Sequence, residues 1–232
     1  MTEERTTVWE RPERGTRGPS PGHSRTRITE VAVRLADAGG LSAVTLRRVA
    51  GELGTGPASL YRYVVDRDDL LDLMTDAAAG EIDLSVPLTG DPAADLVALA
   101  VRSKEVHLRH PWLLDVPPEP ARTGPRGLDH LEYALGALAP VRLPGPAKLE
   151  TVAMLNALVA ALARAELGSG RTPTSRQRAQ AAYLAGAARD GARPRLAAAL
   201  AEQPGGEPGE EPHVRFERAI RRALAGLLRP AT

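Results

Sequence analysis

Arginine and tyrosine side chains gather between residues 45 and 67 in a pattern suited to nucleic acid. Arg47 and Arg48 fall in the first turn of one expected helix, and Arg62 lies between Tyr61 and Tyr63 in the next. Guanidinium groups donate hydrogen bonds to phosphate oxygens and to guanine, and tyrosine hydroxyls suit the same oxygens and base edges. Phe, Tyr and Trp together make up only 3% of the chain. Two tyrosines beside one arginine therefore indicate a binding surface.

The first of these helices has a defined start and a buried face. Thr45 is a suitable N-cap, and the apolar residues that follow repeat at the spacing of one helix face: Leu46, Val49, Ala50 and Leu53. The two arginines of the first turn oppose the positive partial charge of the helix N-terminus. A phosphate bound from outside would remove this conflict; the alternative is that both arginines simply extend into water.

A tight turn leads to the second helix. Gly54–Gly56 permits a sharp turn, and Pro57 suits the first turn of a helix that we expect to reach Val64. Leu60 and Val64 are four residues apart and are expected to point inward. The three residues between them are then expected to face outward.

The stretch TLRRVAGELGTGPASLYRYVVDRDDLLDLM resembles the DNA-binding segment of the TetR family of bacterial repressors. The resemblance implies a helix-turn-helix in which the first helix braces the DNA backbone and the second lies in the major groove. By position it implies a base or phosphate contact for Arg47, backbone contacts for Thr45 and Arg48, and a phosphate contact for Arg67. The residues that it implies at the groove are Pro57, Ala58, Ser59, Tyr61, Arg62 and Tyr63.

A further helix completes this unit. Apolar residues at helical spacing predict a helix over residues 25–38, which a Gly-Gly pair ends. Leu41 and Val44 are expected to close a small core. We therefore predict a three-helix DNA-binding domain over residues 25–70.

The chain before and after this domain differs in character. Residues 1–24 have no apolar period and many Gly, Pro, Ser, Thr and Arg residues, which predicts a flexible basic arm. Such an arm either follows the DNA or is a solvated tail. Residues 71–232 are predicted to form a helical domain for effector binding and dimerisation.

The larger domain contains periodic apolar segments and almost no strand signals, so we predict an all-α protein. A helix over residues 66–82 is expected to lead into this domain. The helices expected within it are residues 93–109, 126–139, 147–167, 175–189 and 213–228. Residues 93–229 resemble the tetracycline-repressor type of body at the level of the fold. The resemblance implies a homodimer joined by 147–167 and 213–228, which would place two motifs on a pseudo-palindromic operator; buried helices of a monomer are the alternative.

Candidate contacts for a small-molecule effector are polar or aromatic residues that interrupt the apolar helices. They are His107, Trp112, Tyr133, Met154 and Asn156. Each has a structural alternative, such as core packing for Trp112, gap filling for Met154 and a hydrogen bond across the dimer for Asn156. His107 lies in a short stretch, EVHL, that resembles the segment holding a metal-binding histidine in the family. We find no further metal ligands at matching positions and expect no cofactor.

Composition limits the other functional classes. The chain has no cysteine, which excludes disulfides and thiolate chemistry. No apolar run approaches a membrane span and no secretory signal opens the chain, so we expect a cytoplasmic protein without a membrane partner. Motifs such as a phosphate-binding glycine loop or HExxH are missing, so we expect no enzyme.

The sequence therefore predicts a bacterial, homodimeric regulator of transcription that binds a double-stranded DNA operator. The resemblance implies a repressor released from a palindromic operator by an unidentified small molecule. Two alternatives remain open: a helical interaction or ligand-binding protein without specific DNA binding, and an activator that uses the same motif.

Overall fold

The computed structural model describes residues 6–12, 23–117, 122–169, 172, 174–189, 192–201 and 211–229. Within these ranges the chain forms α-helices and short 3-10 helices and no strands, which confirms the all-α prediction. The elements are α1 (Arg25–Gly39), η1 (Leu41–Ala43), α2 (Leu46–Glu52), α3 (Pro57–Leu60), α4 (Arg67–Ala79), α5 (Pro92–Arg109), η2 (Pro111–Asp115), α6 (Pro125–Ala137), α7 (Gly145–Ser169), α8 (Ser175–Arg189), α9 (Pro194–Ala201) and α10 (Pro212–Leu227).

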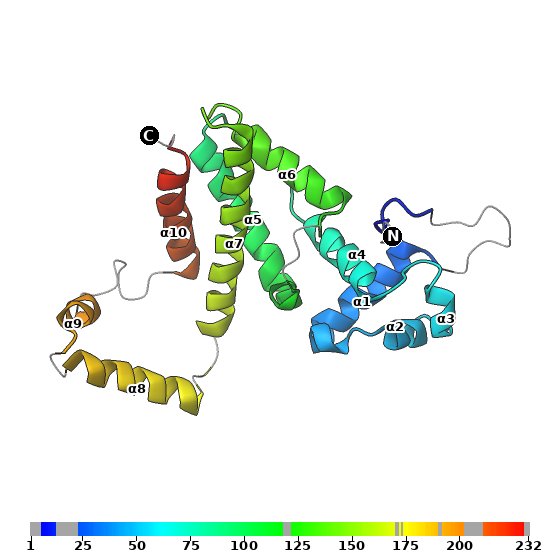
Figure 1. Ribbon diagram of the computed structural model, residues 1–232, viewed down its shortest axis with the longest axis horizontal. Helices are drawn as coiled ribbons and strands as arrows, with labels where there is room; N and C mark the ends of the chain where they lie inside the picture. The colour runs from blue at the N-terminus through cyan, green and yellow to red at the C-terminus, as the bar shows by residue number, and fades with distance from the viewer. Residues whose placement is uncertain are drawn as a thin grey trace, which may run out of the picture.

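The helices form an elongated molecule with distinct parts (Figure 1). Helices α1, α2 and α3 gather at one end, and we call them, with η1, the head. Helices α5, α6, α7 and α10 form the middle, which we call the body, while α8 and α9 lie at the far end. Helix α4 packs against both α1 and α6, so it joins the head to the body.

The head is built around α1. Ser24 caps this helix because its hydroxyl accepts a hydrogen bond from the Arg27 amide at 3.1 Å. Ile28 of α1 packs in the same buried cluster as Val49 of α2 and Leu60 of α3. These contacts confirm the three-helix unit predicted from the apolar spacing.

Helix α4 has the predicted cap and buried face. The Asp66 carboxylate accepts a hydrogen bond from the Asp69 amide at 3.0 Å, and Leu70 and Met74 are fully buried. The helix ends at Ala79, three residues earlier than predicted, and the chain continues as a turn.

The body encloses a second core. Its buried residues come from several helices and include Leu96, Leu99, Leu138, Leu155, Val159, Phe216, Ile220 and Leu224. All predicted helices of this region are present, with bounds that agree within two residues. Helix α9 was not predicted. Residues 202–210, between α9 and α10, lie outside the described residues.

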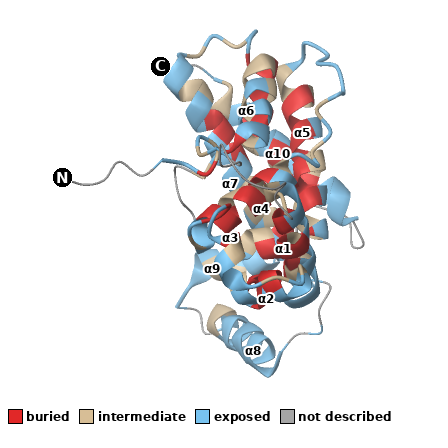
Figure 2. Cartoon of the chain, turned by 90° about the vertical axis from the view of Figure 1, so that its right-hand side faces the viewer, coloured by how far each residue is buried: buried red, intermediate tan, exposed pale blue. Residues whose placement is uncertain are grey.

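Helices α8 and α9 contact each other but bury no side chain (Figure 2). Tyr183 of α8 is 66% exposed and Leu200 of α9 is 55% exposed. These two helices therefore leave apolar side chains uncovered in the single chain.

Helix α7 has apolar side chains on more than one side, and only one of these sides is covered in the single chain. It is long and apolar enough, by length and composition alone, to cross a membrane, which corrects the expectation that no such run exists. Val152, Leu155 and Val159 nevertheless pack into the body core. On the other side Leu149 is 47% and Met154 46% exposed. The helix thus packs on the body with one side and exposes apolar side chains to solvent on the other.

Residues 6–12, which we call the N-terminal segment, are packed onto the head. Val8 is fully buried and Trp9 packs against the head core. Arg11 forms an ion pair with Asp69 of α4. The prediction of a flexible arm is wrong for this segment, because the Val-Trp pair gains burial that overall composition does not reveal. Residues 1–5 and 13–22 of the predicted arm lie outside the described residues.

Candidate nucleic-acid interface

Helix α2 presents its arginines to solvent at an electropositive end. Thr45 Oγ1 accepts a hydrogen bond from the Arg48 amide at 3.2 Å, which confirms Thr45 as the N-cap. Val49 is fully buried on the opposite side, so Arg47 and Arg48 are exposed. The first turn of α2 contains no acidic residue. The helix terminus and both cations therefore add to one positive field.

The turn between α2 and α3 requires glycine at one position. Gly54 has φ of +67°, a conformation that side-chain-bearing residues rarely adopt. Helix α3 then makes a single turn and is shorter than the predicted helix over residues 57–64. Leu60 and Val64 are fully buried, as predicted. The amides of Tyr63 and Val64 both donate to the Leu60 carbonyl, at 2.8 and 3.0 Å, so the chain tightens after α3.

The two tyrosines of this segment have different environments. Tyr61 is 54% exposed, and Arg62 beside it is also exposed. Tyr63 is only 3% exposed and belongs to the head core, so the expectation that it faces outward is wrong. Its backbone carbonyl accepts a hydrogen bond from Arg25 Nε at 3.2 Å. The early end of α3 is the physical reason, because the bend turns Tyr63 inward.

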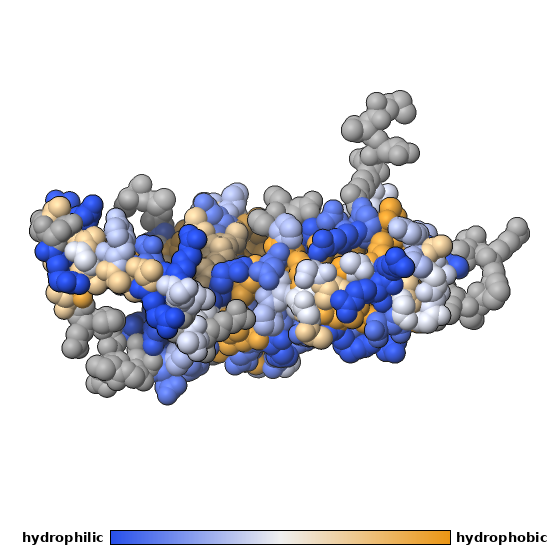
Figure 3. All heavy atoms as spheres, turned by 90° about the horizontal axis from the view of Figure 1, so that it is seen from below, coloured by the Kyte–Doolittle hydropathy of each residue, from blue (hydrophilic) through white to orange (hydrophobic). Residues whose placement is uncertain are grey.

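The remaining predicted DNA contacts lie on the surface of the head or at the start of α4. Pro57 and Ala58 are exposed and Ser59 is partly exposed. Arg67 is exposed at the start of α4, and its Nη2 donates to the Leu41 carbonyl at 3.3 Å. Seen from below, the part of the surface formed by the head is largely hydrophilic, with apolar side chains visible between the polar ones (Figure 3).

A buried carboxylate that the sequence analysis missed holds the end of this motif. Asp69 is 3% exposed, and its Oδ2 accepts a hydrogen bond from the Val65 amide at 2.6 Å. The same carboxylate pairs with Arg11. A signal was present, because Asp69, Leu73 and Asp76 recur at the spacing of one helix face.

Polar groups also meet inside the body. Lys104 is 4% exposed; its Nζ lies 2.9 Å from Glu166 Oε2 and 4.7 Å from the centre of the Phe216 ring. This ion pair links α5 to α7, and the ring belongs to α10. Nearby in sequence, Ser103 Oγ lies 3.5 Å from His130 Nε2. Burial, and then the charge of Arg102, lowers the pKa of His130, which favours its neutral imidazole.

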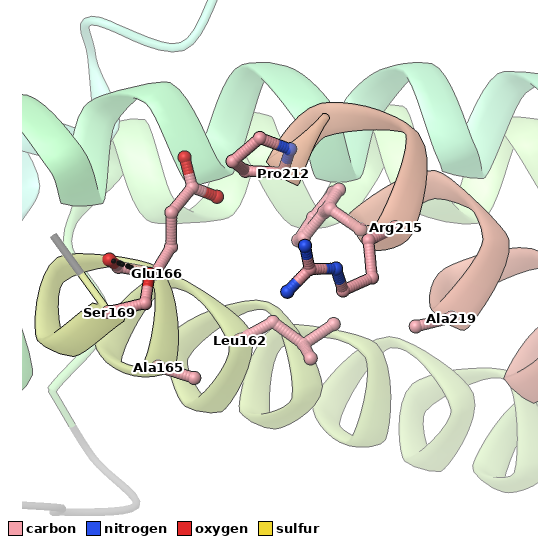
Figure 4. Close-up of a pocket in the computed structure, with 8 residues that line it drawn as sticks. Leu162, Ala165, Glu166, Ser169, Pro212, Arg215 and Ala219 are labelled. Atoms are coloured by element: carbon pink, nitrogen blue, oxygen red, sulfur yellow. Dashed lines mark hydrogen bonds between the residues drawn. The ribbon is translucent and has the colours of Figure 1, made fainter. Parts of the chain in front are cut away.

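A small cavity adjoins this ion pair (Figure 4). It has a volume of about 140 Å³ and lies between α7 and α10. Figure 4 shows Glu166 and Ser169 of α7 on one side and Pro212 and Arg215 of α10 on the other. Drug-sized ligands occupy pockets of about 300–1,000 Å³. The cavity is therefore too small for such a ligand in this conformation.

Both parts of the chain match known protein families. Residues 28–74 match the family described as bacterial regulatory proteins, tetR family, and residues 86–230 match the tetracyclin repressor-like, C-terminal domain. The chain belongs to the TetR family. The predicted resemblance is thereby confirmed.

Two relatives in the TetR family are similar to this chain over part of their length. The HTH-type transcriptional repressor DrrR1 of Streptomyces coeruleorubidus is 38% identical over 161 residues, which cover 69% of this chain and 60% of DrrR1. An HTH-type transcriptional regulator of Saccharopolyspora erythraea is 34% identical over 132 residues, which cover 57% of this chain and 56% of that protein. The chain thus spans less than two thirds of either relative.

Solved TetR-family structures share the fold over nearly the whole chain. Apo ActR from Streptomyces coelicolor has a TM-score of 0.72 and 29% identity, covering 91% of this chain and 97% of ActR. ActR in complex with actinorhodin has a TM-score of 0.70 and 28% identity, covering 91% and 98%. The head and body of this chain therefore have the arrangement seen in ActR.

The effector contacts predicted for this TetR-family chain do not form one pocket. Trp112 is 1% exposed and packs with the head core, where its Nε1 donates to Asp37 Oδ1 at 2.8 Å. Tyr133 packs against the separate body core, and its hydroxyl donates to the Val86 carbonyl at 2.8 Å. The structural alternative is thus confirmed for Trp112.

The other predicted effector contacts lie on different surfaces. Met154 and Asn156 are exposed on α7 in the single chain. His107 is partly buried on α5, and its Nδ1 donates to the Ser103 carbonyl at 2.8 Å. Burial lowers the pKa of His107. Among the described residues no cluster of acids and histidines could hold a metal ion.

Proposed function

We propose that this TetR-family protein is a sequence-specific DNA-binding regulator, a repressor that a small molecule releases from a palindromic operator. The observation that carries the proposal is the electropositive start of α2, with Arg47 and Arg48 exposed, beside the exposed Tyr61 and Arg62 of the α3 region. These groups match phosphate oxygens and base edges. The similarity to DrrR1, which is named as a transcriptional repressor, supports the same function.

The proposed DNA contacts come from a DNA-binding domain over residues 25–70, which comprises the head and the start of α4. Helix α2 braces the phosphate backbone and α3 enters the major groove, with Tyr61 and Arg62 at its end. The proposed contact residues are Thr45, Arg47, Arg48, Pro57, Ala58, Ser59, Tyr61, Arg62 and Arg67. Tyr63 is not among them because its side chain is buried.

We further propose that residues 71–232 dimerise through α7 and α10. The exposed apolar face of α7 includes Leu149 and Met154, and Val214 of α10 is 50% exposed. Covering these faces would remove apolar surface from water. A two-fold dimer would present two heads to two half-sites of one operator. Such a protein would act in the cytoplasm, where its DNA lies.

The proposed effector is a small organic molecule. ActR, whose fold this chain shares, has been solved with actinorhodin and with (S)-DNPA. A ligand that favours the DNA-incompetent arrangement of the two heads would lower operator affinity, and DNA would lower ligand affinity by the same factor.

Selection of bound sequences from random duplex DNA tests this function. We expect the selected DNA sequence to be two-fold symmetric and to bind far more tightly than scrambled DNA. Its affinity for the protein should fall steeply as the salt concentration rises. The variant Arg47→Ala/Arg62→Ala should lose this preference. The matched control Arg176→Ala/Arg178→Ala removes two exposed arginines of α8 and should keep it.

The other outcomes separate the alternatives. No enrichment at any salt concentration would overturn the proposal in favour of a helical interaction protein. In a reporter assay with the selected operator upstream of a promoter, repression should give way to expression when the protein is removed. Expression that rises with the protein would instead identify an activator.

A further inference from the structure

A large cavity lies at the joint between the head and the body, away from the small cavity of Figure 4. Its volume is about 540 Å³, which falls within the range of small-molecule pockets. The N-terminal segment, α1, α4 and α6 all contribute to its lining. The residues used below are Trp9, Thr26, Val33, Asp76, Ala77 and Arg126.

Asp76 is a buried carboxylate in the wall of this cavity. Asp76 is 9% exposed, and its Oδ1 accepts hydrogen bonds from the backbone amides of Arg126 and Gly127, at 2.9 and 3.0 Å. These amides belong to the first turn of α6, so they fix the carboxylate in place. Both described hydrogen bonds go to Oδ1, which leaves Oδ2 for a donor that enters the cavity. Burial raises the pKa of Asp76, while the two amide hydrogen bonds and the charge of Arg126 oppose that rise. A further cation beside the carboxylate would offset the desolvation that remains.

Trp9 forms an aromatic wall of the same cavity. One edge of its ring lies against Gly124, where a larger residue would collide with the ring and with Asp76. The Trp9 indole is therefore held next to the Asp76 carboxylate, and Trp9 remains partly exposed. An aromatic face attracts a cation and also packs against apolar groups. Val33 and Ala77 add apolar surface.

Two of the other charges that line the cavity pair with neighbours outside it. Glu30 pairs with Arg27, and Glu81 pairs with Arg109. Three arginines also line the cavity: Arg25, Arg34 and Arg126. Arg25 Nε donates to the Tyr63 carbonyl. The buried acid beside the indole is thus the feature that distinguishes this cavity from the mixed surface around it.

We propose that this cavity is a small-molecule site for an organic ammonium ion that carries an apolar or aromatic group. The ammonium group donates to Asp76 Oδ2, and the apolar group packs on Trp9 and Val33. Because the walls come from α1 of the head and α6 of the body, a bound ligand contacts both sides of the joint and changes the affinity for DNA by linkage. This last consequence rests on the proposed DNA-binding function, whereas the site itself does not.

Tryptophan fluorescence without DNA tests the site. The chain has two tryptophans, so the variant Trp112→Phe reports on Trp9 alone. We expect 4-phenylbutylammonium to cause a saturable change and to bind at least tenfold more tightly than the neutral 4-phenylbutanol. Asp76→Asn keeps the Oδ1 acceptor and should weaken the amine at least tenfold while leaving the alcohol unchanged. Equal binding of amine and alcohol, or an amine affinity that Asp76→Asn does not change, would overturn the proposal.

Calorimetry on the unmodified chain covers the case that Trp112→Phe fails to fold. The same amine should release or absorb heat with a stoichiometry of one per chain. Ala77→Leu fills the cavity from an exposed helix position and should abolish binding, while Ala98→Leu on the exposed side of α5 should not. No saturable heat up to several millimolar amine would overturn the site.

Operator binding separates this proposal from the proposed function. If the amine binds but random DNA yields no operator, the proposed function fails and the site stands. If an operator is found and the amine does not bind, the site alone fails. If both bind, the amine should shift operator affinity in the unmodified chain and not in Asp76→Asn; an equal shift in both would refute the coupling.

Discussion

Trp112 Nε1 donates a hydrogen bond of 2.8 Å to Oδ1 of Asp37, and so ties the body to the first helix of the head. The same oxygen lies 2.7 Å from Nδ1 of His110, whose Nε2 lies 3.0 Å from Glu81 Oε1. Asp37 is near the end of α1, while Trp112 lies in η2, the short helix that follows α5. The core of the head also includes Val106 of α5. The head is therefore not an independent unit, and movement of α5 or η2 must act on α1.

Removal of the Asp37 carboxylate should destabilise the whole chain. Asp37→Ala leaves the buried Trp112 N–H and the facing His110 nitrogen without their acceptor, which should lower the free energy of unfolding by about 1–3 kcal/mol. Urea denaturation at fixed protein concentration measures this change. Glu132→Ala removes an exposed acid of α6 and should change stability by less than about 0.5 kcal/mol. Equal stability of the two variants would show that the Asp37 link contributes nothing.

The two tyrosines around Arg62 should separate binding from stability. Tyr63→Ala empties a place in the head core and should lower the free energy of unfolding by about 3–5 kcal/mol, as for other buried aromatic residues. Tyr61→Ala should leave stability nearly unchanged and weaken binding to the selected operator. Thermal unfolding and DNA titration of both variants measure the difference. Loss of stability in Tyr61→Ala, with none in Tyr63→Ala, would contradict the buried position of Tyr63.

The sequence predicted the helices of the head because local signals and burial agree there. Thr45 is both a favourable cap and the observed one, and Leu60 and Val64 are buried as their spacing requires. Tyr63 was misplaced because the helical period was extended past Leu60, where the chain in fact bends. A single helical turn is too short for periodicity to define its end.

The sequence did not predict where the candidate effector contacts lie in the fold, because residue type along a helix does not reveal which other helices pack against it. Trp112 is in a core shared with α1, and Asn156 is exposed on α7. The N-terminal segment was missed for a related reason. Val8 and Trp9 are only two apolar residues in a polar stretch, and their burial depends on a surface formed by distant parts of the chain.

Two arginines of the motif should affect DNA binding in different ways. Arg47→Ala should weaken the selected operator by about 1–3 kcal/mol and relax discrimination at one position in each half-site. Arg67→Ala should weaken all sequences alike and reduce the salt slope by about 1, as expected for loss of a phosphate contact. Titrations of operator and scrambled DNA at several salt concentrations measure both effects. If Arg47→Ala lowered the affinity for operator and for scrambled DNA equally, base reading by Arg47 would be excluded.

Two histidines, the buried His130 and the partly buried His107, should make the body less stable in mild acid. Burial lowers the pKa of His107 and of His130 below the ordinary 6.5. As the pH falls below that value, the unfolded chain binds protons that the folded chain does not, so the free energy of unfolding decreases; well above it the histidines have no effect. Thermal unfolding between about pH 8 and pH 5 measures this slope. His107→Gln/His130→Gln should flatten it, whereas His213→Gln, at an exposed position of α10, should not.

The buried ion pair of the body should respond unequally to loss of its two partners. Glu166→Ala leaves the Lys104 ammonium, whose side chain is 5% exposed, without its carboxylate. An unpaired buried charge should lower the free energy of unfolding by about 3 kcal/mol or more.

Lys104→Met should have a smaller effect, because the Glu166 side chain is 24% exposed and keeps its contact with water. Methionine also retains the apolar packing on Phe216 that the lysine stem provides. Urea denaturation of both single variants and of the double variant measures the coupling between the two side chains. If Lys104→Met were as damaging as Glu166→Ala, the position of Lys104 on the Phe216 ring, rather than burial of its charge, would be the main source of stability at this site.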